Sequence, residues 1–289
     1  MNTTMKPGSV VVGVDGSSEC ASALEWAVRH AVLRNRPLLL VHGAGDPARG
    51  SVSLGTTETR RILKRAARQI TDRALGDVRR LAPTLDVEVT TPLQDARQAL
   101  LALADRASII AVGTRGRGPV RSLFLGSVST AIAEHAACPV AVVRPTQGDA
   151  LGDRRVVVGV DGGVTSAAAL DLAFDLAATG GQALHIVHSW SDVEMYVDRY
   201  SPEQRLHEAD ARERLLAESL VGYAEKYPDV AVTRQTLDGS PVHALVSMSQ
   251  DAEALVVGSR GLTGLKAVLG SVSRDVVERA ACTVVVARS

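Results

Sequence analysis

The chain repeats its own pattern, so its fold must be built twice. The segment VVVGVDGS at residues 10–17 returns as VVVGVDGG at residues 156–163, and AACPVAVVR at residues 136–144 returns as AACTVVVAR at residues 280–288. The period is about half of the chain, whereas solenoid repeats run to roughly 20 to 50 residues. The copies are therefore predicted to be whole domains, at residues 1–146 and 147–289, joined by a stretch rich in turn-forming residues.

Within each copy, short β-branched runs alternate with helical patterns. Residues 10–15 and 109–112 lack polar alternation, which is typical of strands covered on both faces of a parallel sheet. Helices are expected at residues 19–33, 57–81 and 94–104, and a long helix at residues 202–226. This order predicts two tandem α/β, Rossmann-like domains. Ligands of such folds bind outside the carboxyl ends of the strands, where the strand order changes direction.

Composition narrows the class of partner and the compartment. Lysine plus arginine equals aspartate plus glutamate, at 32 each, so bulk charge gives no reason to expect nucleic acid or a membrane surface as partner. No apolar run approaches the roughly 18 residues of a membrane span, and the first residues do not resemble a signal peptide. An odd, unclustered set of three cysteines fits a reducing compartment. We expect a cytoplasmic protein.

A phosphate-binding pattern occupies residues 109–130, IIAVGTRGRGPVRSLFLGSVST, and recurs at residues 254–273. A strand leads into a glycine-spaced loop and then into a helix start. Unpaired N–H groups at a helix N-terminus suit an anionic phosphate, and glycine permits close approach. Glycines also serve plain strand-to-helix turns, and this alternative stays open for the loop taken alone.

Basic and histidine residues near this pattern have competing interpretations. Arg115 and Arg260 are the cations best placed to reach a phosphate, or they are exposed loop charges. The histidines His42 and His188 end equivalent strands, and we expect structural or ligand-edge roles because no nucleophile pattern accompanies them. No zinc-type cluster and no G-K-S/T loop signature occurs, so no metal site is expected. The helix at 57–81 could bind an acidic partner or present a solvated basic face, through Arg60, Arg61, Lys64, Arg65, Arg68, Arg73, Arg79 and Arg80.

The order of these motifs, met twice, resembles the universal stress protein family, and the duplication resembles its tandem-domain members. The resemblance rests on VVVGVDGS, a strand ending LVHG, the pattern G-x-x-G-x9-G-S-V-S, and CPVAVVR. It implies a five-stranded parallel sheet in each copy, of the adenine nucleotide alpha-hydrolase type. In the nucleotide-binding branch it also implies ATP, with or without Mg²⁺, across the end of that sheet.

By position, the resemblance assigns Asp15 to the ribose or adenine and Val41 to the adenine. It assigns Val112 and Gly113 to the path from base to phosphate. The glycine loop and the following helix start would hold the triphosphate. The candidate ligand residues are Gly13, Asp15, Val41, Val112, Gly113, Arg115, Gly116, Gly126, Ser127, Val128 and Ser129 in the first copy, and Asp161, Val187, Val257, Gly258, Arg260, Gly261, Gly270, Ser271, Val272 and Ser273 in the second.

One departure separates the copies. The sequence places nine residues between Gly116 and Gly126 but eight between Gly261 and Gly270. A shorter connection is expected to move the turn or the helix start and so to favour tighter binding in the first copy. Alternatively, the deletion falls in an exposed bulge and moves neither end.

Function is expected to be ATP-dependent regulation or sensing in stress or dormancy physiology, without efficient catalysis, because no dedicated base is visible. The alternatives are an interaction scaffold with weak or no nucleotide binding, and a slow ATPase. Edge strands at residues 140–143 and 284–287 are expected to pair the copies as a pseudo-dimer, and a homodimer is expected in addition. Residues 189–201 carry an aromatic insertion, interpreted as a lid, a dimer contact or packing within the second copy.

Overall fold

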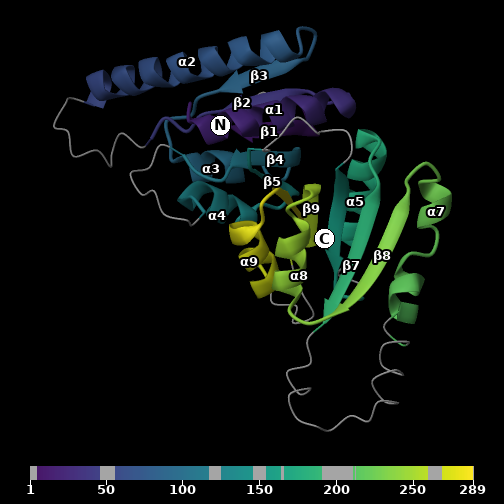
Figure 1. Cartoon of the computed structure of the whole chain (residues 1–289). Coiled ribbons are helices and arrows are strands. Elements are labelled where there is room, and N and C mark those ends of the chain that lie inside the picture. Colours follow the sequence, from purple (N-terminus) through teal and green to yellow (C-terminus); the bar gives the residue numbers. More distant parts are fainter. Residues whose placement is uncertain are drawn as a thin grey trace. The chain divides into compact units, whose positions relative to one another are not determined.

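The computed structural model describes residues 5–45, 56–116, 125–145, 154–163, 166–190, 211, 213–259 and 269–288. The chain divides into two compact units, Met1–Pro145 and Thr146–Ser289, which we call the first and second lobes (Figure 1). Most of the stretch expected to link them lies outside the described residues.

The first lobe is a five-stranded parallel sheet in the order β3-β2-β1-β4-β5, flanked by helices. Its β-branched runs form the strands because both faces of the sheet are covered, and Val10, Val11 and Val12 are completely buried. The elements are β1 (Ser9–Gly13), α1 (Ser18–Leu33), β2 (Leu38–Val41), α2 (Thr56–Leu81), β3 (Val87–Thr90), α3 (Ala96–Leu101), β4 (Ala107–Gly113), α4 (Ser127–His135) and β5 (Val140–Val143).

The second lobe repeats this sheet in the order β8-β7-β6-β9-β10, again with parallel neighbours. The α/β fold with two tandem Rossmann-like domains is confirmed. The elements are β6 (Arg155–Val160), α5 (Ala167–Gly180), β7 (Leu184–Trp190), α7 (Tyr223–Lys226), β8 (Val232–Asp238), α8 (Pro241–Met248), β9 (Ala252–Gly258), α9 (Ser271–Arg279) and β10 (Thr283–Ala287).

The prediction of an unbroken helix over residues 202–226 is wrong in its described part. Helix covers residues 213–219, the chain turns at 220–222, and α7 begins anew at Tyr223. Gly222 makes the break with φ of 85°, a left-handed conformation that glycine adopts without a steric penalty. The apolar periodicity of the sequence continues through this break, so the periodicity alone could not reveal the break.

An aromatic stack holds α7 in place after that break. The ring of Phe174 in α5 lies 4.5 Å from Tyr223 and 5.3 Å from Tyr227, measured between centroids. The Tyr223 hydroxyl donates to Asp171 at 3.1 Å. Burial, with the Asp171 charge as second cause, raises the pKa of Tyr223 to about 12. The turn therefore brings two tyrosines onto α5.

The helix expected at residues 94–104 is shorter than predicted. Asp95 caps it by accepting a hydrogen bond from the Arg97 N–H at 2.9 Å, so Gln94 lies outside the helix. Helical hydrogen bonding ends at Ala102, and the residues up to Arg106 form turns.

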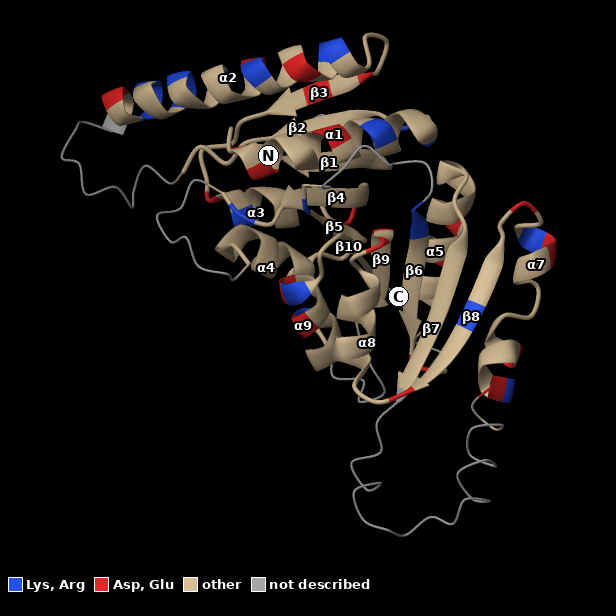
Figure 2. Cartoon of the chain, in the orientation of Figure 1, with Lys and Arg blue, Asp and Glu red and all other residues tan. Residues whose placement is uncertain are grey.

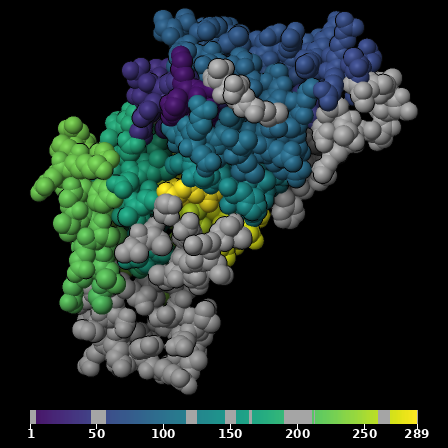
Figure 3. All heavy atoms as spheres, turned by 180° about the vertical axis from the view of Figure 1, so that it is seen from behind, coloured from purple at the N-terminus to yellow at the C-terminus, as the bar shows by residue number. Residues whose placement is uncertain are grey.

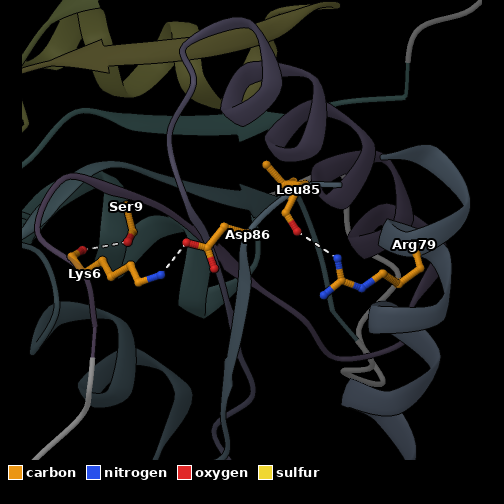
Figure 4. Close-up of polar contacts among 5 residues, drawn as sticks. All are labelled: Lys6, Ser9, Arg79, Leu85 and Asp86. Atoms are coloured by element: carbon orange, nitrogen blue, oxygen red, sulfur yellow. Dashed lines mark hydrogen bonds and ion pairs between the residues drawn. The ribbon is translucent and has the colours of Figure 1, made fainter. Parts of the chain in front are cut away.

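Helix α2 lies on the surface of the first lobe (Figure 3) and carries lysine and arginine along its length (Figure 2). All eight of these cations are exposed. Arg79 satisfies carbonyls beyond the helix end, donating to Leu85 at 2.8 Å and Pro83 at 3.2 Å, and Arg80 pairs with Asp77. The turn that follows is fixed to the N-terminal segment by an ion pair between Asp86 and Lys6 (Figure 4). Within the described part of the chain, no helix combines the length and apolar character needed to cross a membrane.

Candidate functional site

The strand order of each sheet changes direction beside its first strand. In the first lobe the chain adds β2 and β3 on one side of β1, then β4 and β5 on the other. Val11 of β1 lies opposite Leu39 of β2 and Ile110 of β4, so the carboxyl ends of β1 and β4 meet at one edge of the sheet. In open α/β sheets this is the place where ligands bind.

Asp15 and Gly116 come together at that edge. Asp15 follows β1, and its Oδ1 accepts hydrogen bonds from the Ser17 N–H at 2.9 Å and the Ser17 hydroxyl at 2.6 Å. Its other oxygen, Oδ2, lies against Gly116, so close that a Cβ at position 116 would overlap it. The structure therefore brings the carboxylate of the VVVGVDGS motif to the glycine turn of the G-x-x-G-x9-G-S-V-S motif.

Gly113 is the last residue of β4, and it packs against the start of α1. A Cβ at this position would lie 2.8 Å from the carbonyl oxygen of Glu19, so the absence of a side chain lets the turn approach the first turn of α1. The connection then returns to α4 through a hydrogen bond from the Gly126 N–H to the Thr114 carbonyl, at 2.8 Å. Packing thus explains one glycine of the motif.

The N-terminus of α4 has no side-chain cap. Gly126 is the N-cap residue and makes no side-chain hydrogen bond to the first turn. Ser127 is exposed and Val128 half-buried, whereas Ser129 is buried and its hydroxyl donates to the Gly113 carbonyl at 2.5 Å. The Ser129 hydroxyl is thus engaged in holding the helix start against the strand end.

The second lobe reproduces this geometry. The Gly270 N–H donates to the Ser259 carbonyl at 3.0 Å, and the Ser273 hydroxyl donates to the Gly258 carbonyl at 2.6 Å. The N-cap glycine again has no side-chain hydrogen bond, Ser271 is exposed, Val272 is half-buried and Ser273 is buried.

These matching ends can be compared with the displacement expected from loop length. The one-residue deletion was expected to pull the turn or delay the helix, yet the tether from N-cap to strand end is 2.8 Å in one lobe and 3.0 Å in the other. Both helices begin directly after the glycine. The described ends of the connection are therefore alike in the two lobes, as the bulge alternative expects, and tighter binding in the first lobe stays a prediction.

Asp161 occupies the place of Asp15 with a different set of donors. Its Oδ1 accepts from the Gly163 N–H at 3.0 Å and from the Ser166 hydroxyl at 2.6 Å. The Ser166 oxygen in turn accepts from the Asp161 N–H at 3.0 Å. Sequence reasoning missed Ser17 and Ser166 as partners of these carboxylates. The available signal was the aspartate–glycine turn itself, because an aspartate side chain often accepts the N–H two residues on, as Asp15 and Asp161 do.

The two histidines expected at strand ends contact the same turns. His42 directly follows β2, but His188 lies within β7, which continues to Trp190, so the expectation of a strand end is wrong for His188. The ring nitrogen Nδ1 lies 2.6 Å from the Val14 carbonyl in His42 and 3.0 Å from the Val160 carbonyl in His188. A carbonyl can only accept, so Nδ1 donates in both. Each imidazole therefore supports the residue that precedes the aspartate, which confirms a structural role for this nitrogen.

The remaining candidates have these positions. Gly13 faces α3, where a Cβ would lie 3.1 Å from Leu100. Arg115 is exposed beside Gly116. Several expectations fall outside the described residues, namely those on Arg260 and Gly261, on the loops at 117–124 and 260–268, and on residues 191–201 of the aromatic insertion. The four candidate valines are buried, at 1–3% exposure, namely Val41, Val112, Val187 and Val257.

Known proteins place this architecture in a family. The model of the universal stress protein family matches residues 8–144 and 153–288. Universal stress protein Rv2005c of Mycobacterium tuberculosis is 35% identical over 300 residues, covering 100% of this chain and 99% of the relative. A universal stress protein of Mycolicibacterium smegmatis is 33% identical over 290 residues, covering 96% of each chain.

The fold agrees with a solved relative. The crystal structure of a universal stress protein from Archaeoglobus fulgidus matches with a TM-score of 0.71, over 98% of this chain and 99% of that chain, at 18% identity. The family model matches both lobes, and the mycobacterial relatives match over nearly their full length. The chain therefore belongs to the universal stress protein family, as a member with two tandem domains.

Proposed function

We propose that each lobe binds one adenine nucleotide at the edge where its strand order changes direction. The observation that carries the proposal is the meeting of the Asp15 carboxylate with the Gly116 turn, beside a helix N-terminus that has no side-chain cap. A carboxylate accepts hydrogen bonds from sugar hydroxyls but repels phosphate, whereas a helix N-terminus attracts phosphate. This polarity orients the ligand, with its ribose at Asp15 and its phosphates toward α4.

The residues present fit such a ligand. The exposed Ser127 and the backbone N–H groups of the first turn of α4 would hold phosphate, and Arg115 is an exposed cation next to Gly116. In the second lobe Ser271 and the start of α9 would do the same. ATP is the nucleotide we propose, with or without Mg²⁺. When bound, it would contribute the charge and the conformational signal that a regulatory protein reads.

We further propose that the protein holds its nucleotide without efficient turnover. His42 and His188 donate from Nδ1 to the Val14 and Val160 carbonyls, which commits that nitrogen to the fold. The proposal makes the protein a nucleotide-dependent regulator or sensor in stress or dormancy physiology. We place it in the cytoplasm, where thiols stay reduced, because its three cysteines are buried thiols rather than disulfides.

Identification of the bound ligand tests the proposal. Protein purified without added nucleotide would be heat-denatured, and the released small molecules separated by ion-pair chromatography against adenine nucleotide standards. Stripped protein would then be titrated calorimetrically with ATP, ADP and AMP, each with Mg²⁺ and with EDTA, and assayed for phosphate release. We expect adenine nucleotide binding with negligible turnover. A folded protein that binds none of these nucleotides would favour the scaffold alternative, and rapid phosphate release would favour the ATPase.

A further inference from the structure

The two lobes hold their site aspartates by the same geometry but supply it from different residues. In each, one carboxylate oxygen accepts a backbone N–H from two residues further on, at 2.9 Å from Ser17 and 3.0 Å from Gly163. In each, that oxygen also accepts one hydroxyl at 2.6 Å. The intervening glycine has a left-handed φ in both, 78° at Gly16 and 76° at Gly162.

The hydroxyl comes from opposite ends of the turn. In the first lobe Ser17, two residues after the aspartate, donates it, and position five is Cys20. In the second lobe position two is Gly163 and Ser166, at position five, donates it. Cys20 and Ser166 both accept the aspartate's own N–H, at 3.4 Å and 3.0 Å. Among the described contacts, a serine hydroxyl donates to the aspartate in each lobe, from position two in the first lobe and from position five in the second.

This pairing fixes the direction of the carboxylate. Two donors on Oδ1 of Asp15 stop rotation about the Cβ–Cγ bond, and the second oxygen is then directed to Gly116. Both hydrogen bonds have a charged acceptor, which makes each stronger than a bond between neutral groups, and the hydroxyl bond is the shorter of the two, at 2.6 Å against 2.9 Å. A carboxylate without it would keep the N–H contact but would rotate more freely.

We propose that Ser17 and Ser166 are positioning residues, which orient Asp15 and Asp161 toward the ribose hydroxyls, and that the two positions are interchangeable. The inference rests on the proposed function, because it assigns the ribose to these carboxylates. Ser17→Gly reproduces the second lobe's residue and removes the hydroxyl. Because glycine is itself an accepted N-cap residue, the loss of the Ser17 cap on Cys20 disturbs α1 little. Adding Cys20→Ser then supplies the hydroxyl from position five.

The test uses full-length protein carrying Asp161→Ala, so that only the first lobe contributes. Its affinities for ATP and for 2′,3′-dideoxy-ATP are measured by calorimetry. Ser17→Gly is expected to weaken ATP binding roughly tenfold and to leave the affinity for the dideoxy analogue unchanged. The ratio of the two affinities therefore decreases. Ser17→Gly with Cys20→Ser is expected to restore it. Ser18→Gly is the matched control, because the Ser18 hydroxyl donates to Glu19.

Several results would overturn the inference. Equal losses for ATP and the dideoxy analogue would make Ser17 merely structural, and failure of the double variant to recover would refute interchangeability. An unaffected Ser17→Gly variant, where Asp15→Ala weakens ATP binding, would sink this inference but leave the proposed function standing. No effect of Asp15→Ala would sink the proposed function itself. If the Ser17→Gly variant unfolds at a lower temperature, the reciprocal substitutions in the second lobe are tested in an Asp15→Ala background. There Ser166→Cys must reduce the ratio of the affinities for ATP and for the dideoxy analogue, and adding Gly163→Ser must restore that ratio.

Discussion

The carboxylate of Asp15 occupies the space in which any residue other than glycine at position 116 would place its Cβ. Asp15 follows the first strand and Gly116 the fourth, so 101 positions of sequence separate two groups that touch. The contact exists because parallel strands end together at one edge of the sheet. It makes the glycine part of the site through its missing side chain.

Gly116→Ala is therefore expected to displace the Asp15 carboxylate and weaken nucleotide binding in the first lobe by roughly tenfold or more, the value of a lost charge-assisted hydrogen bond. Stability should change little, because the displaced atom is the end of a side chain. Calorimetric titration and thermal melting measure the two effects. Gly76→Ala in α2 is the control: its Cβ meets nothing within 4 Å, so it should stabilise the helix by about 0.5 to 1 kcal/mol and leave binding alone.

Ser129→Ala should destabilise the first lobe by about 1 to 3 kcal/mol, because the buried Gly113 carbonyl loses the hydroxyl that donates to it at 2.5 Å. Ser127→Ala, at the exposed neighbouring position, should change stability by no more than about 0.5 kcal/mol. Urea denaturation monitored by circular dichroism compares the two variants. Equal destabilisation would contradict the distinction between the buried and the exposed serine.

His30 is expected to remain neutral at pH values well below those at which a histidine ordinarily takes up a proton. Burial, followed by the nearby Arg34 and Arg29 charges, lowers the pKa of His30 to about 4. The ring stacks on Trp26 at 4.8 Å. Because the folded pKa is below the unfolded value near 6.5, the unfolded state takes up the proton first. The stabilisation of the fold by neutral His30 is therefore fully present above pH 6.5 and is lost as the pH falls toward 4. At pH 4 the free energy of unfolding has decreased by roughly 2 to 3 kcal/mol.

His30→Phe keeps a stacked ring and removes the titration. Its free energy of unfolding should therefore fall less between pH 7 and pH 4 than that of the unaltered protein. Denaturant titrations at half-unit intervals give both curves, and NMR of the imidazole protons reports protonation of His30 directly. A His30 that titrates near pH 6.5 in the folded protein would disprove the buried neutral state.

Much of the fold was predictable because its signals are local. The β-branched runs of β1 and β4 lie in consecutive residues, and the duplication repeats them in β6 and β9. The meeting of Asp15 with the glycine turn followed from a general rule about parallel strand ends. The paired edge strands and the homodimer stay predictions.

Other features depended on distant atoms or on backbone angles. The break at Gly222 is set by a left-handed glycine within an apolar pattern that continues past it. The inward direction of the Ser129 hydroxyl depends on the carbonyl of Gly113, and the close fit at Gly113 depends on the backbone of Glu19. The shorter second loop leaves the hydrogen bond between its N-cap glycine and the strand end in place, which loop length alone could not decide, and its effect on affinity stays a prediction.

Binding stoichiometry tests the central claim, one nucleotide site at the edge of each sheet, most directly. Stripped protein would be titrated with ATP alongside Asp15→Ala, Asp161→Ala and the double variant, each shown by circular dichroism to be folded. We predict two sites per chain in the unaltered protein, one in each single variant and none in the double variant at concentrations that saturate the unaltered protein. A folded double variant that still binds two ATP molecules with unchanged affinity would contradict the account.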